Sequence, residues 1–113
     1  MSKTFLFTVE YKLPAKEIEN LLDSASRGSS YWCSSSLGYA SETKKLIKGE
    51  DVKMYDHEGE RNLTLNLKKV YRGMQIFAKK HPESFADWLK GDYDMNIGDL
   101  FLQICLFGKE KYA

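Results

Sequence analysis

The segment 97–108, with the sequence IGDLFLQICLFG, constrains the fold more than any other part of the chain. Drawn as a helix it is apolar around almost its whole circumference, and such a helix must be buried. Its polar exceptions are Asp99 and Gln103, which lie four residues apart and therefore on one face. A buried carboxylate and a buried amide need hydrogen-bond partners. We therefore expect the rest of the chain to wrap around this helix and to supply those partners.

Alternating apolar residues predict three strands. The first, at 4–11, carries its apolar side chains at odd-numbered positions: Phe5, Phe7, Val9 and Tyr11. This alternation is typical of a strand with one buried face. Two more strands, at 51–56 and 61–65, are predicted on either side of a hairpin turn at 57–60. Together the three strands would form a small antiparallel sheet.

Helical spacing of apolar residues predicts about four helices, at 14–27, 67–80, 82–90 and 97–107. Pro14 and Pro82 suit a first helical turn, and Asn66 is a favourable N-cap. The basic residues at 44–48 fit either a short helical turn or a loop. The sequence thus predicts one α+β domain over residues 1–113. Its antiparallel sheet of about three strands would pack against about four helices, the last of them buried.

Composition argues against several classes of partner, although a locally basic face remains possible. The 113 residues include 17 Lys and Arg and 16 Asp and Glu, a formal net charge of +1. This balance gives no strong nucleic-acid signal, and the chain is not acidic enough to imitate DNA. No apolar run approaches the roughly 20 residues of a membrane span. The N-terminus has no signal-peptide pattern, so we expect a cytoplasmic protein with two reduced cysteines, Cys33 and Cys105.

The residues that could support metal binding or catalysis lack the spacing that these functions need. The cysteines and His57 and His81 form none of the short-range pairs of structural zinc sites. Cys33 has no flanking signature of a catalytic nucleophile, and the acids at 92, 94 and 99 fit helix caps better than a hydrolase pair. No phosphate-binding glycine loop is present. We expect no metal, no cofactor and no catalysis.

Asp99 and Gln103 allow two interpretations. In the structural one, Asp99 caps its own helix, and Gln103 bonds to backbone or to Tyr31, which fastens the serine-rich loop to the helix. In the functional one, they line a pocket with Tyr31, Trp32 and Asn96 that accepts a small polar ligand or a partner loop.

Tyr31 and Trp32 are the strongest interface candidates, because they lie on a glycine- and serine-rich loop that also carries Tyr39. Aromatic anchors supply contact area at a low entropic cost. The alternative is that Trp32 fills the rim of the core. Arg27 and Arg72 are candidates for binding an anion or a carboxylate. The full set of candidate binding residues is Arg27, Tyr31, Trp32, Tyr39, Arg72, Asn96, Asp99 and Gln103.

Three motifs carry a resemblance to a known family. They are Gly28-Ser29-Ser30-Tyr31-Trp32, Arg72-Gly73-Met74-Gln75-Ile76 followed by Phe85-Ala86-Asp87, and Gly98-Asp99-Leu100-Phe101-Leu102-Gln103 running to Leu106-Phe107-Gly108 and Tyr112. In this order they resemble a family of small proteins encoded by tailed phages and prophages. The chain departs from that family at Arg27, where Gly is usual, and at Ile97, where Thr is usual.

The resemblance implies a phage-type accessory protein that acts in the bacterial cytoplasm by binding rather than by catalysis. Its partner would be a host protein or a defence complex, such as a component of a CRISPR–Cas system, which it would inhibit. An alternative is a sponge that sequesters a small signalling nucleotide between aromatic side chains and arginine. A homodimer is also compatible with these expectations.

Overall fold

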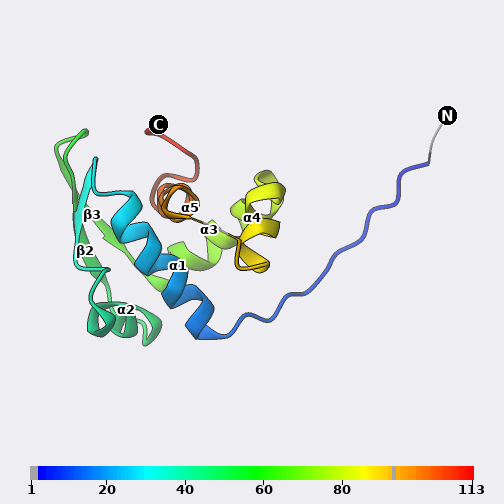
Figure 1. The fold of residues 1–113 in the computed structure, drawn as a ribbon, viewed down its shortest axis with the longest axis horizontal. Helices are drawn as coiled ribbons and strands as arrows, with labels where there is room; N and C mark the ends of the chain where they lie inside the picture. Colours follow the sequence, from blue (N-terminus) through cyan, green and yellow to red (C-terminus); the bar gives the residue numbers. More distant parts are fainter. Residues whose placement is uncertain (1–2, 93) are drawn as a thin grey trace.

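The computed structural model describes residues 3–92 and 94–113 and confirms the α+β class (Figure 1). Its helices and strands, in chain order, are α1 (Ala15–Gly28), β1 (Cys33–Ser35), α2 (Ala40–Ile47), β2 (Val52–Asp56), β3 (Arg61–Leu65), α3 (Leu67–Lys80), α4 (Pro82–Leu89) and α5 (Met95–Phe107). The basic stretch at 44–48 belongs mostly to α2, a helix that the sequence left undecided. None of the described helices is long and apolar enough to cross a membrane.

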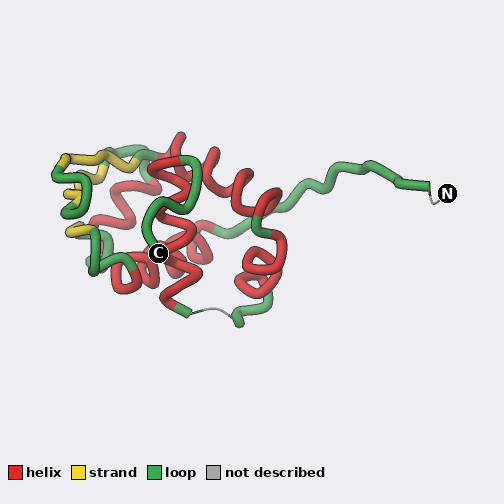
Figure 2. Tube along the Cα trace, turned by 90° about the horizontal axis from the view of Figure 1, so that it is seen from above, coloured by secondary structure: helices red, strands yellow, loops and turns green. Residues whose placement is uncertain are grey.

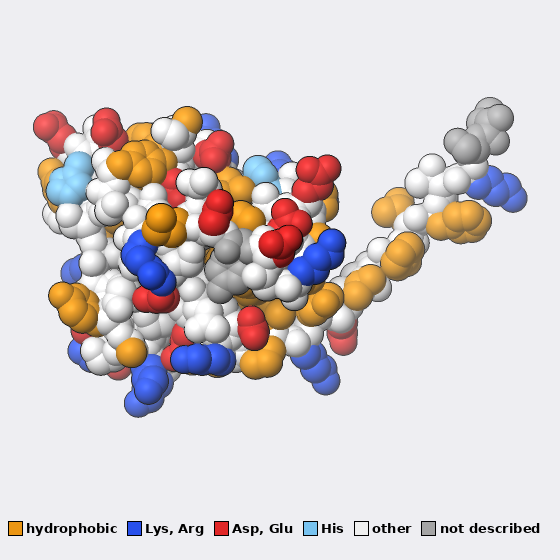
Figure 3. All heavy atoms as spheres, viewed as in Figure 1, with side chains coloured by type: hydrophobic (Ala, Val, Ile, Leu, Met, Phe, Trp, Pro, Cys, Tyr) orange, Lys and Arg blue, Asp and Glu red, His pale blue; other side chains and the backbone are white. Residues whose placement is uncertain are grey.

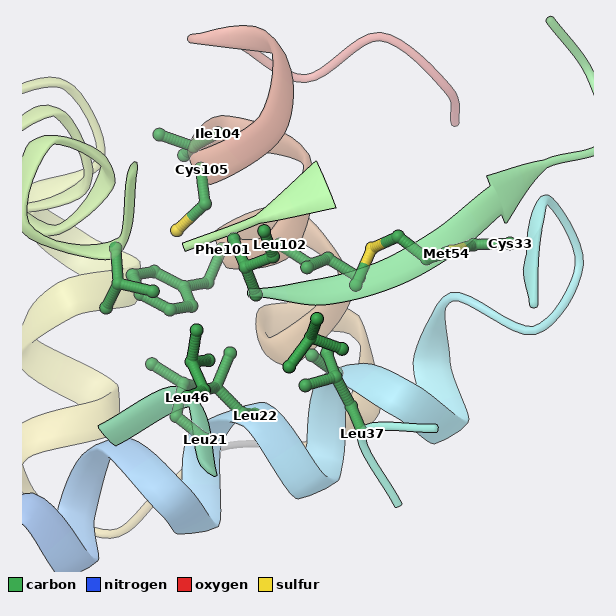
Figure 4. Packing of buried hydrophobic residues seen from close by; sticks show 14 of the residues in the cluster. Leu21, Leu22, Cys33, Leu37, Leu46, Met54, Phe101, Leu102, Ile104 and Cys105 are labelled. Carbon is green, nitrogen blue, oxygen red and sulfur yellow. The ribbon is translucent and has the colours of Figure 1, made fainter. Parts of the chain in front are cut away.

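Helix α5 forms the centre of the core, as its composition predicts. It packs against α1 on one side and α3 on the other. Figure 4 shows Phe101 and Leu102 of α5 beside Leu21 and Leu22 of α1, all fully buried. At Gly98 the two helices approach so closely that an added Cβ would lie 2.6 Å from the Ala25 backbone nitrogen. A glycine is required there because no side chain fits between the backbones.

The sheet is antiparallel throughout, with the strand order β1-β2-β3. The register of the β2–β3 hairpin pairs Val52 with Leu65 and Met54 with Leu63. Alternate residues of β2 are buried, so one face of the sheet joins the core. Figure 2 shows the three strands gathered at one end of the molecule, beside the helices.

Side chains and a glycine fix the ends of two helices. The Asn66 Oδ1 accepts a hydrogen bond from the Lys69 N–H at 2.9 Å, which confirms the predicted N-cap of α3. The Asp94 Oδ1 accepts from the Asn96 N–H at 3.0 Å, so Asp94, one of the acids expected to cap a helix, is the N-cap of α5, which begins at Met95. Gly108 ends α5 with a left-handed φ of 78°.

The predicted first strand at 4–11 is wrong. This segment pairs with no described strand and extends away from the rest of the molecule (Figures 1 and 3). The side chains of Phe5 and Phe7, expected in the core, are 82% and 80% exposed. The third strand is instead β1, because the edge of β2 is occupied by Cys33–Ser35. Alternation predicts an apolar strand face, but it does not say which strand edge that face will join.

Candidate functional site

The Asp99 carboxylate is the centre of a buried hydrogen-bond network. Its Oδ2 accepts from the Tyr31 hydroxyl at 2.7 Å, and its Oδ1 accepts from the Trp32 indole N–H at 2.8 Å. The Gln103 amide donates to the same Oδ1 at 3.1 Å. Three donors compensate a carboxylate that is only 8% exposed. The network fixes the loop that follows α1 onto α5.

Gln103 fastens a second segment to α5. Its Oε1 accepts from the backbone N–H groups of Lys111 and Tyr112, both at 2.7 Å, and its Nε2 donates to the Tyr112 carbonyl at 3.0 Å. Gln103 also lies 3.4 Å from the Tyr31 hydroxyl. Gln103 therefore bonds to backbone and to Tyr31, as the structural interpretation predicts. The predicted cap by Asp99 is wrong, because Asp94 caps α5 and Asp99 faces the aromatic pair.

A second buried carboxylate, Asp56, connects the same C-terminal segment to the sheet. The Tyr112 hydroxyl donates to Asp56 Oδ2 at 2.7 Å, and Arg61 Nε donates to it at 3.2 Å. Two N–H groups of the hairpin turn, at 58 and 59, donate to its Oδ1. Burial raises the pKa of Asp56, but these hydrogen bonds outweigh it and hold the pKa below the usual value. Burial and the contact with Asp56 raise the pKa of Tyr112.

The two adjacent aromatic residues have different environments. Trp32 is fully buried, with its ring 5.6 Å from that of Phe107 and 5.2 Å from that of Tyr112 between centroids. Trp32 thus fills the rim of the core, and a partner cannot reach its side chain. Tyr31 is 49% exposed. Partial burial, together with the hydrogen bond to Asp99, raises the pKa of Tyr31 to about 12. Its hydroxyl therefore stays protonated and keeps its position at neutral pH.

Around Tyr31 lies a shallow depression of about 380 Å³, which we call the Tyr31 surface. Its lining residues come from the loop after α1, from the first turns of α5 and from the C-terminal segment: Tyr31, Asn96, Asp99, Glu110, Tyr112 and Ala113. Asn96 and Glu110 are exposed. The described lining contains two carboxylates and no Lys or Arg.

Only some of the predicted site residues meet at this surface. Tyr31, Asn96 and Asp99 line it, and Gln103 supports it from beneath. Arg27 lies on α1, where it forms an exposed ion pair with Asp23 at 2.6 Å. Tyr39 is exposed beside the start of α2, and Arg72 is exposed on α3. The predicted combination of aromatic residues with arginine in one pocket is therefore not assembled at the Tyr31 surface.

Sequence reasoning missed the contribution of residues 110–112. These residues follow the Gly108 stop signal and show no periodicity, so no local pattern places them anywhere. The residue that could have pointed to this contribution is Gln103, because a buried amide needs several hydrogen-bond partners. Its partners are mostly the backbone groups of the C-terminal segment, whereas the serine-rich loop was expected.

The geometry does not favour a nucleophile or a metal site. Cys33 is buried, and burial, with Asp56 and Asp99 nearby, raises the pKa of its thiol to about 12. Ser34 Oγ lies within hydrogen-bond distance of His57 Nε2, but the structure gives no carboxylate bonded to this histidine within residues 3–92 and 94–113. Over the same residues no group of three His, Cys, Asp or Glu side chains could hold a metal ion.

Comparison with protein-family models, with curated proteins and with solved structures finds no match to this chain.

Proposed function

We propose that this chain is a phage-type accessory protein without catalytic activity that binds a host protein and inhibits it by covering part of its surface. The sequence resemblance supplies the phage-type part of this proposal and the bacterial cytoplasm as the place of action. In this proposal the inhibited host protein is a component of a bacterial defence system, and the chain acts in the manner of an anti-CRISPR protein. The Tyr31 surface is the contact that we assign to the partner.

The observation that carries the proposal is the arrangement of Tyr31. Half of this side chain faces solvent, while its hydroxyl is held by Asp99 and its loop is anchored by the neighbouring buried Trp32. An aromatic side chain that is already ordered loses little entropy when it binds. Tyrosine is also among the residues that contribute most to protein interfaces. Tyr31 therefore has the properties of an anchor residue.

The charge around Tyr31 indicates the kind of partner. The exposed Glu110 and the buried Asp99 both line the depression. These carboxylates favour a partner that presents Lys or Arg around an aromatic or apolar recess. They also repel the phosphates of a nucleotide, so no observation favours the sponge alternative at this surface.

Copurification from bacterial cells with an active defence system tests the proposal. The tagged chain is compared with Tyr31→Ala and with Glu110→Lys, which reverses a charge at an exposed position. Tyr55→Ala is the matched control, because Tyr55 is a partly exposed tyrosine on the sheet and lies outside the Tyr31 surface. Circular dichroism verifies that each variant is folded.

We expect Tyr31→Ala to reduce capture of the partner at least tenfold, which corresponds to a loss of about 1.4 kcal/mol of binding free energy. Glu110→Lys should slow association, most clearly at low salt. Unchanged capture by a folded Tyr31→Ala variant would remove this surface from the interface. Plating of a phage on immune cells measures the inhibition itself. Equal plating with and without the chain would refute the inhibitory function.

A further inference from the structure

The chain continues past the end of α5 as a short segment, residues 109–113, that belongs to no helix or strand, and we call it the C-terminal strap (Figure 1, red). The side chains at 109–111 and at 113 are exposed, and within the strap Tyr112 alone is partly buried. A segment that buries so little surface opens at a lower free energy than the whole domain unfolds. How firmly the strap is held therefore depends on a few contacts.

Two fully buried polar side chains hold the strap. Gln103 Oε1 accepts from the backbone N–H groups of Lys111 and Tyr112, and Gln103 Nε2 donates to the Tyr112 carbonyl. Asp56 Oδ2 accepts from the Tyr112 hydroxyl. Both Gln103 and Asp56 are 0% exposed. Among the described residues, the hydrogen bonds of the strap all begin or end at Lys111 or Tyr112.

The Tyr112 ring adds the apolar part of the attachment. It lies 5.2 Å from the ring of Trp32 and 5.9 Å from that of Phe107 between centroids. Tyr112 thus covers part of the aromatic cluster at the rim of the core. The attachment of the whole strap is concentrated in this residue and its neighbour Lys111.

Gly108 has the properties of a hinge for the strap. Its φ of 78° is in the left-handed region, and a Cβ added there would meet no atom within 4 Å. The chain therefore turns in open space between α5 and the strap. The Gly108 N–H bonds back to the Ile104 carbonyl at 2.8 Å, so α5 would keep its last turn if the strap moved.

The closed strap forms half of the Tyr31 surface. Glu110, Tyr112 and Ala113 are three of the six described lining residues. The Tyr31 hydroxyl also lies 3.4 Å from the Tyr112 carbonyl, so the strap contacts the anchor residue itself. Without the strap the depression would lose half of its lining, and the buried amide oxygen of Gln103 would lose both of its donors.

We propose that the C-terminal strap opens and closes about Gly108 independently of global unfolding, and that only the closed strap completes the surface that binds the partner. Tyr112 holds the closed state through its contacts with Gln103 and Asp56. The coupling to the partner rests on the proposed function, whereas the opening of the strap does not. A partner that binds only the closed strap stabilises that state, and closure in turn strengthens binding.

Amide hydrogen exchange of the full chain, followed by NMR over a series of low urea concentrations, tests the opening. The amides of Lys111 and Tyr112 are protected by their bonds to Gln103. After correction for intrinsic rates, we expect them to exchange about tenfold faster or more than the amides of Leu102 and Ile104 in α5, with little dependence on urea, because a local opening exposes little surface. Equal protection of both sets, with the steep urea dependence of global unfolding, would overturn the proposal.

Tyr112→Phe tests how the hydroxyl group holds the strap. The variant keeps the aromatic ring and removes one hydrogen bond to the Asp56 carboxylate, so the strap amides should exchange about tenfold faster than in the unmodified chain. Tyr39→Phe is the matched control, because Tyr39 is an exposed tyrosine outside the strap and the Tyr31 surface. Unchanged strap exchange in a folded Tyr112→Phe variant would contradict the assigned role of Tyr112.

The host protein captured by the chain tests the coupling. Added at about ten times its dissociation constant, it should slow exchange of the strap amides about tenfold, because binding to the closed strap raises the population of that state. Unchanged exchange in the complex would show that the partner binds the open and the closed strap alike, which overturns the coupling. If no host protein is captured, the proposed function fails and the coupling fails with it, while exchange in the free chain still decides whether the strap opens.

Discussion

Replacing Asp99 by alanine is the sharpest test of how the loop, α5 and the C-terminal segment are held together. The substitution removes the acceptor of three donors at once: the Tyr31 hydroxyl, the Trp32 indole N–H and the Gln103 amide. The three donors differ in whether they can find another acceptor. Tyr31 can turn to solvent because it is half exposed, and Gln103 keeps the Tyr112 carbonyl. The indole N–H of Trp32, in a fully buried side chain, has no other acceptor in the network.

The expected cost follows from this difference. A buried donor left without an acceptor costs about 1–3 kcal/mol, and the weakened bonds of the other two donors add about 1 kcal/mol. We therefore expect Asp99→Ala to lower the free energy of unfolding by about 2–4 kcal/mol, a large share of the 5–15 kcal/mol typical of a domain. Asp99→Asn should cost about 1 kcal/mol, because its amide oxygen still accepts from Trp32.

Urea unfolding, followed by circular dichroism and by tryptophan fluorescence, measures both changes. The slope of the unfolding free energy against urea concentration should be the same for both variants and the unmodified chain. A loss below 0.5 kcal/mol in Asp99→Ala, with that slope unchanged, would refute the central role of this carboxylate. Equal losses of unfolding free energy in the alanine and asparagine variants would show that the negative charge of Asp99 matters more than its role as the acceptor for Trp32.

Three further predictions concern packing and pH. Gly98→Ala should destabilise the chain by about 2 kcal/mol or more in urea, because the added methyl group meets the backbone at Ala25, although alanine favours a helix. The low pKa of Asp56 stabilises the folded state above the unfolded-state pKa, and this stability is lost as the pH falls below about 4. Asp56→Asn should therefore melt at a lower temperature than the unmodified chain at pH 7, and its melting temperature should fall less as the pH is lowered. Melting temperatures of the two proteins that fall in parallel with pH would contradict this. The raised pKa of Tyr31 contributes stability below pH 10, which is lost as the pH rises toward 12. In Tyr31→Phe the stability should fall less steeply as the pH rises from 10 toward 12. A fall as steep as that of the unmodified chain would count against the hydrogen bond to Asp99.

The candidate site was only partly predictable from the sequence. A polar pair on an apolar helix shows that partners are required, and Tyr31 is indeed one of them. The sequence did not distinguish the exposed Tyr31 from the buried Trp32, because both lie on the same irregular loop and have similar apolar area. Nor did it exclude Arg27 and Arg72 from the site, since their distance from Tyr31 depends on how the helices pack.

The sequence by itself determined the elements whose signals are local. The caps and spacing of α3, the β2–β3 hairpin and the burial of α5 follow from hydrophobic period, turn residues and the cost of exposing an all-apolar helix. Only the tertiary structure decided the long-range choices. It gave the third strand to Cys33–Ser35 and left the apolar segment 4–11 unpaired, because strand pairing is a competition among distant segments that periodicity cannot rank. It also turned Asp99 and Gln103 of the buried helix toward the loop and the C-terminal segment, which leaves Tyr31 as the exposed part of their network.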